Sequence, residues 1–354
     1  MDLLTRIRHT ISLELFNTMN KPAYRLIMKI KSRFAILHGL KSASFTESQQ
    51  KVLIFGAAGF VGGYLAREFA NNGYLVFGSD LQKDCSVEAI EAYYAADITD
   101  EQEVLRTCIQ VDPDIIIDLA AISSVGLSWK QPKATFDVNV GGAVNVLEAA
   151  RKQAMPPKVL LVGSSEEYAP LDRPLKESDP VDATSPYGIS KIAQESLADL
   201  YGSRYGLKIY QTRSFNHTGV GQTTNFVLPN WISQVAEIER SGSPGVLKVG
   251  NLNVSRDFSD VRDVVRAYRM LVESNHYGEV FNIGSGKALS LRELLEMIVS
   301  LSSQEITVEV DPGLLRPSDT PYICCDGSKI ADKLGFIPEI PLSETFESIF
   351  RELA

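Results

Sequence analysis

Short apolar runs alternate with segments of helical amphipathic spacing along most of the chain. The apolar runs predict strands at residues 51–55, 74–79, 93–98, 114–119, 158–163 and 208–213. Between them, the spacing predicts helices near 60–72, 100–110, 132–154 and 186–205. Mostly apolar strands separated by amphipathic helices are typical of a parallel sheet covered on both faces. The pattern therefore predicts an α/β fold with a doubly wound parallel sheet.

The alternation weakens after about Phe215, where shorter segments are interrupted by prolines and glycines. This change predicts a smaller, mixed C-terminal part. Residues 1–50 also differ from the rest, because they are basic and their apolar residues are scattered. A pair of amphipathic helices on a surface, a targeting segment and an extension with little structure are the alternatives for this segment.

Charge narrows the range of partners. The chain has 354 residues, of which 22% are charged, and its net charge is −9. Residues 1–50 carry eight Lys and Arg against three Asp and Glu, whereas the remainder carries 27 against 41. An acidic body of this kind repels phosphate groups, so nucleic-acid binding is not expected.

The cysteines point to no metal site and no disulfide framework. They are Cys85, Cys108, Cys324 and Cys325, with no CxxC pair, and the chain has four histidines. Reduced structural thiols in a cytoplasmic protein are the expected state. No apolar run approaches the roughly 18 residues that a membrane span needs, so no transmembrane segment is expected.

A glycine-rich turn follows the first predicted strand and opens the first predicted helix. Its residues are Gly56, Ala57, Ala58, Gly59, Phe60, Val61 and Gly62. Glycines here let the backbone approach a pyrophosphate, and the helix N-terminus adds free N–H groups and positive partial charge. The spacing is GxxGxxG rather than GxGxxG, so a turn needed only for packing is the alternative.

Asp80 ends the second predicted strand, about 20 residues beyond the turn. An acid at this position accepts hydrogen bonds from ribose hydroxyls and repels a 2′-phosphate. An ordinary turn former is the alternative for a single Asp. Together with the glycine turn, Asp80 predicts that the chain binds NAD(H) in preference to NADP(H).

Tyr187 and Lys191 are four residues apart in the helix predicted at 186–205, so they share one face. A cation beside a phenol favours the phenolate, so we expect Lys191 to lower the pKa of Tyr187 and make it an acid and base. Ser164 follows the fifth strand, at the edge where a doubly wound sheet binds its ligand. We expect Ser164 and Tyr187 to meet one substrate oxygen, with an ordinary turn as the alternative for Ser164.

Together these segments resemble the extended short-chain dehydrogenase/reductase family, in the branch that modifies nucleotide sugars. The resemblance covers roughly residues 51–350. Further residues that carry it are Asp97, Ile98, Leu119, Ala120, Ala121, Asn139 and the segment 213–217. It implies that the cofactor is bound by the glycine turn, Tyr187 and Lys191. It also implies cofactor contacts for six of the residues just named: Asp97, Ile98, Leu119, Ala120, Ala121 and Asn139.

Three segments are similar to the GDP-6-deoxy-D-mannose reductases. They are 213–222 (RSFNHTGVGQ), 256–268 (RDFSDVRDVVRAY) and 315–319 (LRPSD). Ser214 and Val220 replace prolines of the family pattern RPFNHxGPGQ, which affects the conformation of the loop rather than its chemistry. The resemblance implies a GDP-sugar substrate.

Substrate-binding residues are expected on both sides of the site: Ser123, Ser128, Glu166, Asn216, His217, Arg256 and Arg316. Guanidinium groups bind phosphates bidentately, which suits Arg256 and Arg316 to a diphosphate. A surface salt bridge is the alternative for each arginine. For His217 a contact with the hexose and a satisfied loop histidine are equal alternatives.

Glu166 leaves the reaction open. Dehydratase relatives use a glutamate at this Ser/Thr-x-Glu position as the base that removes the C5 proton, whereas elsewhere it can bond a sugar hydroxyl. We expect reduction of the C4 ketone of GDP-4-dehydro-6-deoxy-D-mannose to GDP-D-rhamnose. A GDP-mannose 4,6-dehydratase, a UDP-sugar 4-epimerase and a catalytically silent dinucleotide sensor are the alternatives.

The resemblance also implies how the chain is organised. We expect a basic N-terminal extension at 1–50 and an NAD(P)-binding Rossmann domain at 51–215 plus about 253–284. The nucleotide-sugar-binding domain is expected at 216–252 plus 285–354. A homodimer is expected, in which the helices near 132–154 and 186–205 pair with their copies in a four-helix bundle.

Overall fold

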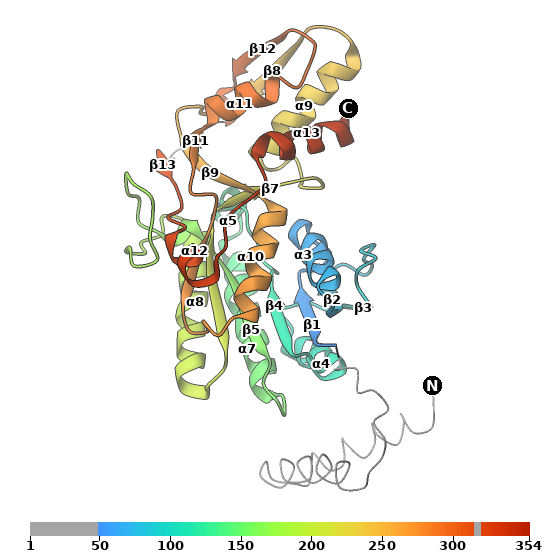
Figure 1. Cartoon of the computed structure of the whole chain (residues 1–354), viewed down its shortest axis with the longest axis vertical. Helices are drawn as coiled ribbons and strands as arrows, with labels where there is room; N and C mark the ends of the chain where they lie inside the picture. Colours follow the sequence, from blue (N-terminus) through green and yellow to red (C-terminus); the bar gives the residue numbers. More distant parts are fainter. Residues whose placement is uncertain (1–48, 315–319) are drawn as a thin grey trace. The chain divides into compact units, whose positions relative to one another are not determined.

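A parallel sheet is the centre of the computed structural model, which describes residues 49–314 and 320–354. Within these residues, seven strands lie in the order β10-β6-β5-β4-β1-β2-β3 (Figure 1). They are β1 (Lys51–Phe55), β2 (Leu75–Asp80), β3 (Ala92–Ala95), β4 (Ile115–Asp118), β5 (Lys158–Ser164), β6 (Ile209–Ser214) and β10 (Val280–Ile283). The order reverses between β1 and β4, which is where a sheet of this kind binds ligands at its carboxyl edge.

Helices cover both faces of this sheet. On one face, α3 (Phe60–Asn71) and α10 (Val261–Glu273) pack on strand residues such as Ile54 and Ile117. On the other, α4 (Glu101–Val111), α7 (Gly142–Lys152) and α8 (Pro186–Tyr205) pack on residues such as Leu53 and Ile116. Neighbouring strand residues thus face opposite cores, which explains why the strands are apolar throughout. The predicted doubly wound α/β fold is confirmed.

A smaller mixed part surrounds a separate core. Its four-stranded sheet contains β7 (Asn216–Thr218), β9 (Ser255–Asp260), β11 (Ala288–Ser290) and β13 (Tyr322–Ile323), and β8 (Gly245–Val249) pairs with β12 (Ile306–Val310). The core lies among α9 (Val227–Ser241), α11 (Leu291–Val299) and α13 (Leu342–Leu353), at the top of Figure 1. The remaining short elements are η3 (Pro312–Leu314) and α12 (Ser328–Leu334).

The helix predicted at 132–154 is interrupted. The structure contains α6 (Pro132–Phe136), one π-helical turn η1 (Asp137–Gly141) and then α7, preceded by the unpredicted α5 (Val125–Lys130). The π-turn contains Asn139, whose amide bonds across to the loop after β4 and to α8. An inserted residue of this kind is common where a helix serves a functional site.

Two other differences concern strands. β3 ends at Ala95 rather than at 98, because the N–H of Asp97 donates to the carboxylate of Glu103 instead of to a neighbouring strand. β10 was not predicted as a strand, and it is only four residues long.

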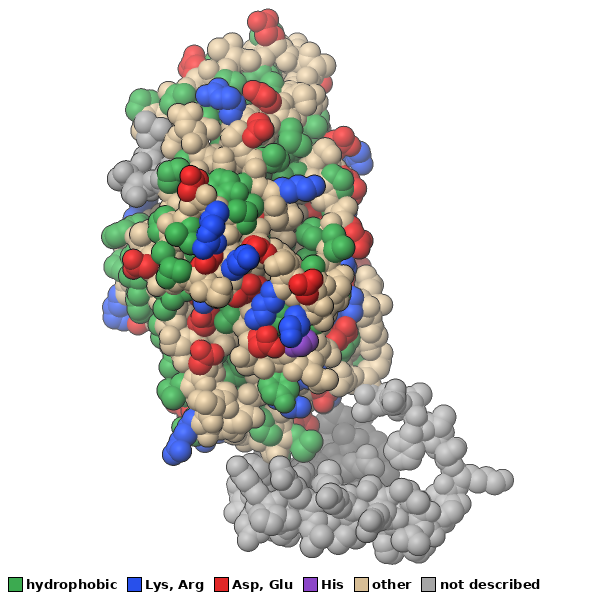
Figure 2. All heavy atoms as spheres, turned by 60° about the vertical axis from the view of Figure 1, so that its left-hand side comes forward, with side chains coloured by type: hydrophobic (Ala, Val, Ile, Leu, Met, Phe, Trp, Pro, Cys, Tyr) green, Lys and Arg blue, Asp and Glu red, His purple; other side chains and the backbone are tan. Residues whose placement is uncertain are grey.

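The surface shown in Figure 2 mixes charges of both signs with apolar side chains. No helix in the described part of the chain is long and apolar enough to cross a membrane. The predictions for the first 48 residues and for Arg316 fall outside the described residues.

Candidate active site

The glycine turn between β1 and α3 is a close-packed backbone cradle. Gly56 has φ +81°, and a Cβ on it would lie 2.8 Å from the backbone nitrogen of Ala120. A Cβ on Gly62 would lie 2.5 Å from the carbonyl oxygens of Gly56 and Ala57. Gly59 is the N-cap of α3 and offers no side chain to its first turn. This geometry fits a pyrophosphate, because the glycines let the turn pack closely at the N-terminus of α3, whose first N–H groups have no acceptor within the helix.

Asp80 lies beside this turn at the end of β2. Its Oδ2 accepts a hydrogen bond of 3.2 Å from the backbone N–H of Ala58. The carboxylate is therefore held next to the cradle, where the ribose of a bound dinucleotide is recognised in folds of this type.

Asp97 and Ile98 follow β3 with different surroundings. Oδ1 of Asp97 accepts hydrogen bonds from the backbone and hydroxyl of Thr99, at 2.9 and 2.7 Å. Ile98 is buried and packs against Gly142 of α7, where a Cβ would lie 3.0 Å from its side chain. Their expected contact with the adenine of the cofactor stays a prediction.

Asn139 holds the loop that contains Leu119, Ala120 and Ala121. It is buried, and its amide accepts from the N–H of Ile122 at 2.8 Å and donates to the Ser190 hydroxyl at 2.9 Å. Its Nδ2 also donates to the carbonyl of Ile122 at 3.3 Å. In this structure Asn139 positions the loop, and its expected contact with the cofactor stays a prediction.

Ser164, Tyr187 and Lys191 meet at the carboxyl end of β5. They are 7%, 8% and 4% exposed, respectively. Ser164 caps the short helix η2 (Ser165–Glu167), while Pro186 and Tyr187 open α8 behind the N-cap Ser185. Ser164 is close enough to Tyr187 for its hydroxyl to lower the pKa of the phenol. The helix start fixes Tyr187 at the strand end, where its phenol and Ser164 can meet one substrate oxygen.

The expected effect of Lys191 on Tyr187 is wrong for this structure. Burial raises the pKa of Tyr187 above its usual range, the Ser164 hydroxyl opposes the rise, and Glu167 and Glu166 add to it. The Lys191 ammonium instead donates to the carbonyl of Val162, at 2.7 Å. Burial of the phenol is the largest influence on its pKa, Lys191 is not among the groups that shift it most, and Tyr187 stays protonated.

Lys191 is itself held by neighbours at the sheet edge. Its ammonium also donates to Gln194 Oε1 at 2.9 Å. Burial lowers the pKa of Lys191, while the carboxyl groups of Asp118 and Glu167 act in the opposite direction. Burial raises the pKa of Asp118 to about 6. Burial and the two nearby carboxyl groups therefore have opposite effects on the pKa of Lys191.

Ser128 differs from its expected role as a substrate contact. It is fully buried, its hydroxyl donates to the carbonyl of Val125 at 2.7 Å, and it accepts from the backbone N–H of Tyr187 at 3.2 Å. Ser128 thus ties α5 to the start of α8 and acts on the site through Tyr187. Ser123, five residues before it, is exposed in the loop that precedes α5.

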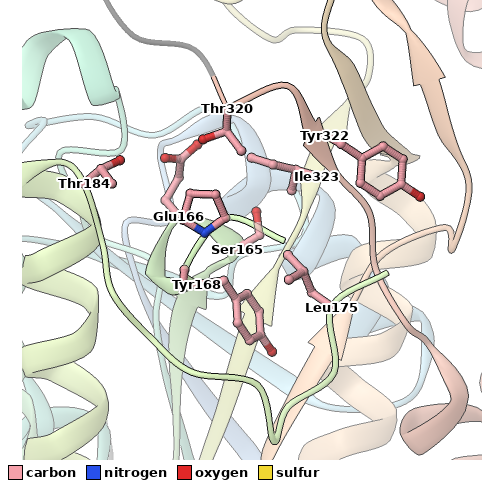
Figure 3. Close-up of a pocket in the computed structure, with 10 residues that line it drawn as sticks. Ser165, Glu166, Tyr168, Leu175, Thr184, Thr320, Tyr322 and Ile323 are labelled. Atoms are coloured by element: carbon pink, nitrogen blue, oxygen red, sulfur yellow. The ribbon is translucent and has the colours of Figure 1, made fainter. Parts of the chain in front are cut away.

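A pocket opens next to Ser164, between η2 and β13 (Figure 3). It is lined by Ser165, Glu166, Tyr168, Ala169, Pro170, Leu175, Thr184, Thr320, Tyr322 and Ile323. In Figure 3 the carboxylate of Glu166 points toward the hydroxyl of Thr320. Its lining combines polar side chains such as Glu166 and Thr320 with apolar ones such as Leu175, a mixture typical of ligand sites.

The smaller sheet contributes the other expected substrate residues. Asn216 is on β7 and Arg256 on β9, which pair directly. The ring of His217 stacks on Phe60 of the glycine turn, with centroids 6.4 Å apart and planes 11° apart. This stack joins the loop after β6 to the dinucleotide cradle. In the described part of the chain, no group of three or more His, Cys, Asp or Glu side chains is arranged to hold a metal ion.

A family model described as GDP-mannose 4,6 dehydratase matches residues 53–349. The chain belongs to this family. It is 30% identical to the GDP-6-deoxy-D-mannose reductase of Pseudomonas aeruginosa, over 68% of this chain and 80% of that protein. It is 28% identical to the GDP-mannose 4,6-dehydratase of Yersinia enterocolitica, over 83% of this chain and 91% of that protein.

Solved structures agree with the family assignment. The structure of RMD from Pseudomonas aeruginosa complexed with NADPH is similar with a TM-score of 0.76 and 26% identity, over 86% of this chain and 99% of that chain. UDP-glucose 4-epimerase from Thermotoga maritima with UDP-glucose has a TM-score of 0.79 and 26% identity, over the same shares. This member of the GDP-mannose 4,6 dehydratase family is therefore an extended short-chain dehydrogenase/reductase enzyme, as the resemblance predicted.

Several polar residues beside the site were not predicted: the buried Asp118, Glu167, Gln194 and Arg213, and the partly buried Glu195. Two signals in the sequence indicate some of them. Asp118 ends a strand as Asp80 does, and Glu195 lies four residues after Lys191 on one helix face. No local signal shows that Glu167 and Arg213 meet, because they come from different strand ends.

Proposed function

We propose that this enzyme reduces the C4 ketone of GDP-4-dehydro-6-deoxy-D-mannose to GDP-D-rhamnose, using NADH or NADPH. The observation that supports it most is the buried, protonated Tyr187 beside Ser164 at the carboxyl end of β5, in a chain 30% identical to a GDP-6-deoxy-D-mannose reductase. A reductase needs a proton donor at the carbonyl oxygen, and a phenol whose pKa is raised is in the donating form.

Each residue has a distinct part in the proposed reaction. Tyr187 donates its proton to the C4 oxygen, and Ser164 donates a hydrogen bond to that same oxygen as negative charge develops on it. Lys191 binds the nicotinamide ribose hydroxyls. The bound nicotinamide dinucleotide supplies the hydride. Because the pair is buried, water does not compete for the C4 oxygen.

The dinucleotide and the substrate occupy neighbouring parts of the sheet edge in this proposal. The glycine turn, Asp80, Asp97, Ile98 and the loop 119–121 hold the cofactor, and Asp80 favours NAD(H). Arg256, with Arg316 outside the described residues, binds the GDP diphosphate, and Asn216 and His217 adjoin it. Glu166 bonds a hexose hydroxyl.

Consumption of reduced cofactor tests the reaction. Purified protein is incubated with the 4-keto sugar plus NADH or NADPH, with GDP-mannose alone, and with UDP-glucose alone. We expect loss of the reduced-nicotinamide absorbance with the keto sugar only, faster with NADH, and GDP-D-rhamnose in the products by mass spectrometry. Product from GDP-mannose without added reductant contradicts the reductase.

A GDP-mannose 4,6-dehydratase is the second candidate. It is favoured by the position of Glu166, two residues after Ser164 and lining the neighbouring pocket, where a base for the C5 proton belongs. Its first step, however, takes a proton from the C4 hydroxyl, for which a phenol with a raised pKa is poorly suited. The GDP-mannose arm of the same assay separates the two.

We also propose that the enzyme is a cytoplasmic homodimer. Ile189, Leu200 and Tyr205 on α8, and Phe136 at the end of α6, are exposed apolar residues on the helices expected to pair. Light scattering after size exclusion measures the state, and a monomer at micromolar concentration contradicts it.

A further inference from the structure

Glu167 is fixed directly to Ser164 from inside the protein. Its side chain is fully buried, and Oε1 accepts a 2.7 Å hydrogen bond from the backbone N–H of Ser164. The two residues form a reciprocal capping box around η2. Gly163 leaves room for the carboxyl group, because a Cβ there would lie 2.5 Å from Oε1. The carboxyl group of Glu167 therefore sets where the end of β5 presents Ser164.

An arginine and a second acid face this carboxyl group. Arg213 on β6 is buried, and its guanidinium donates two hydrogen bonds to Glu195 of α8, at 2.9 and 2.6 Å. Its Nε lies 3.6 Å from Oε2 of Glu167. Arg213 thus makes its strong bidentate interaction with Glu195, and its electrostatic attraction to Glu167 is weaker.

The surroundings of Oε2 of Glu167 indicate that this carboxyl group is protonated. As an ionised oxygen this buried atom accepts no hydrogen bond, which is costly away from water. As an O–H group it can donate to Glu195. Burial and the charge of Glu195 raise the pKa of Glu167 to about 8, against the opposing effects of the Ser164 N–H and Arg213.

Other ionisable groups that face Glu167 come from α8. Tyr187 and Lys191 both respond to its charge, which raises the pKa of each. The neutral form of Glu167 therefore leaves the reacting phenol free of an additional buried negative charge.

We propose that Glu167 is a positioning residue: its protonated carboxyl group donates to Glu195 and holds Ser164 beside Tyr187, where both hydroxyls can meet one substrate oxygen. This rests on the proposed function only in taking Ser164 and Tyr187 as the pair that meets the substrate oxygen. Glu167 touches neither substrate nor cofactor. Its loss should slow the chemical step without weakening binding of either.

Two substitutions separate the shape of Glu167 from its hydrogen bonds. In Glu167→Gln, the amide oxygen still accepts from Ser164 and the amide NH₂ replaces the acid proton toward Glu195, so kcat should stay within about three-fold of wild type. Glu167→Met keeps the length but removes both bonds, and kcat should fall about 10–100-fold with KM and cofactor Kd within about two-fold. Should the Met variant not fold, Glu167→Asp withdraws the acid from Ser164 and should show a similar loss.

Gln211→Leu is the matched control. Gln211 lies two residues before Arg213 on the same strand and donates to Asp199 of α8 at 2.7 Å, without reaching Ser164. It should lower the melting temperature but leave kcat within about two-fold. Equal kcat losses in the Met and Leu variants, or a loss that appears in KM or Kd, overturn the proposal.

The Ser164→Ala background gives a second criterion. If Glu167 acts through Ser164, adding Glu167→Met to Ser164→Ala should cost little further kcat, whereas additive losses contradict the proposal. Variants are assayed on whichever nucleotide sugar the wild type turns over, so a wrong substrate assignment shows in the wild type alone. Crystal structures of the Gln and Met variants give the result without activity: the position of Ser164 beside Tyr187 should persist in the first and be lost in the second.

Discussion

The glycine turn and the Ser164–Tyr187 end of the site depend on different parts of the chain, the first on backbone and the second on side chains. The turn is backbone, and its requirement is space, since added methyl groups at Gly56 or Gly62 would overlap neighbouring main chain. The catalytic end is made of polar side chains from β5, α5 and α8 that are almost entirely buried. Its requirement is the protonation state and direction of each group.

This difference predicts which property a substitution impairs in each region. Volume added to the turn should weaken cofactor binding while leaving the reacting groups intact. Removal of one oxygen at the catalytic end should leave binding intact and stop the reaction. Substitutions that change only volume or only a proton therefore test the comparison directly.

The largest effect is expected for Tyr187→Phe, which removes the proton donor and almost no volume. Turnover should fall about 10²–10⁴-fold, the usual contribution of a positioned acid, while the Kd for the dinucleotide stays within about two-fold. Steady-state kinetics and fluorescence titration measure the two quantities. Tyr201→Phe is the control, because it removes a hydroxyl from the same helix where it bonds to Glu148. Retention of wild-type kcat in Tyr187→Phe refutes the assignment of the acid.

The next largest effect is expected for Gly62→Ala. The new methyl group would meet two carbonyl oxygens at 2.5 Å. Backbone displacement of this kind costs about 1–3 kcal/mol, so the Kd for the dinucleotide should rise about tenfold or more. With saturating cofactor, kcat should recover toward that of the wild type.

Gly202→Ala in α8 is the control for the added methyl group. Its Cβ would lie 3.7 Å from its nearest neighbour, the carbonyl of Leu207, which is an ordinary contact. The substitution should raise the free energy of unfolding by roughly 0.5–1 kcal/mol, through the better helix propensity of alanine. An equal loss of cofactor affinity in both variants contradicts the steric explanation.

Local patterns were sufficient to predict the backbone half of the site. The strand before Gly56, the helix after Gly62 and the acid ending β2 are all encoded in contiguous stretches, and α8 was predicted over the bounds it has. The π-turn at Asp137–Gly141 was not, because it depends on where Asn139 must reach across the fold.

The protonation states at the catalytic end could not be predicted from spacing either. Four residues between Tyr187 and Lys191 place them on one face, but the direction of the Lys191 ammonium is set by the Val162 carbonyl and Gln194. The raised pKa of Tyr187 follows from burial, which only the packed structure reveals. The same holds for the contact of Glu167 with Arg213.

A smaller effect is expected for Asp80→Asn at the boundary of the cradle. The amide keeps an oxygen for the N–H of Ala58 but removes the charge that disfavours a 2′-phosphate. The ratio of kcat/KM for NADPH to that for NADH should rise about tenfold. Asp84→Asn, in the exposed segment after β2, removes the same charge a few residues away and should leave the ratio unchanged. Equal shifts in both variants indicate a general field effect rather than a contact of Asp80.

The smallest effect is expected in how the melting temperature depends on pH, and it reports on the protonation of Glu167. The pKa of Glu167 is raised to about 8 in the folded protein, above its usual 4.5. A group of this kind contributes stability at low pH, and the contribution is lost as pH rises through the folded pKa. Glu167→Gln does not titrate, so the melting temperature of wild type relative to this variant should fall between about pH 5 and pH 9, by about 2–4 °C per kcal/mol.

The paired measurement removes the other titrating groups. Asp118, with a pKa raised to about 6, also loses its contribution as pH rises, but it does so in both proteins and cancels in the difference. His217, whose pKa is lowered by burial, cancels in the same way. A difference that stays constant from pH 5 to pH 9 shows that Glu167 keeps one protonation state throughout, and a difference that grows with pH shows that it is ionised and held by Arg213. Either result contradicts a titration of Glu167 near pH 8 in the folded protein.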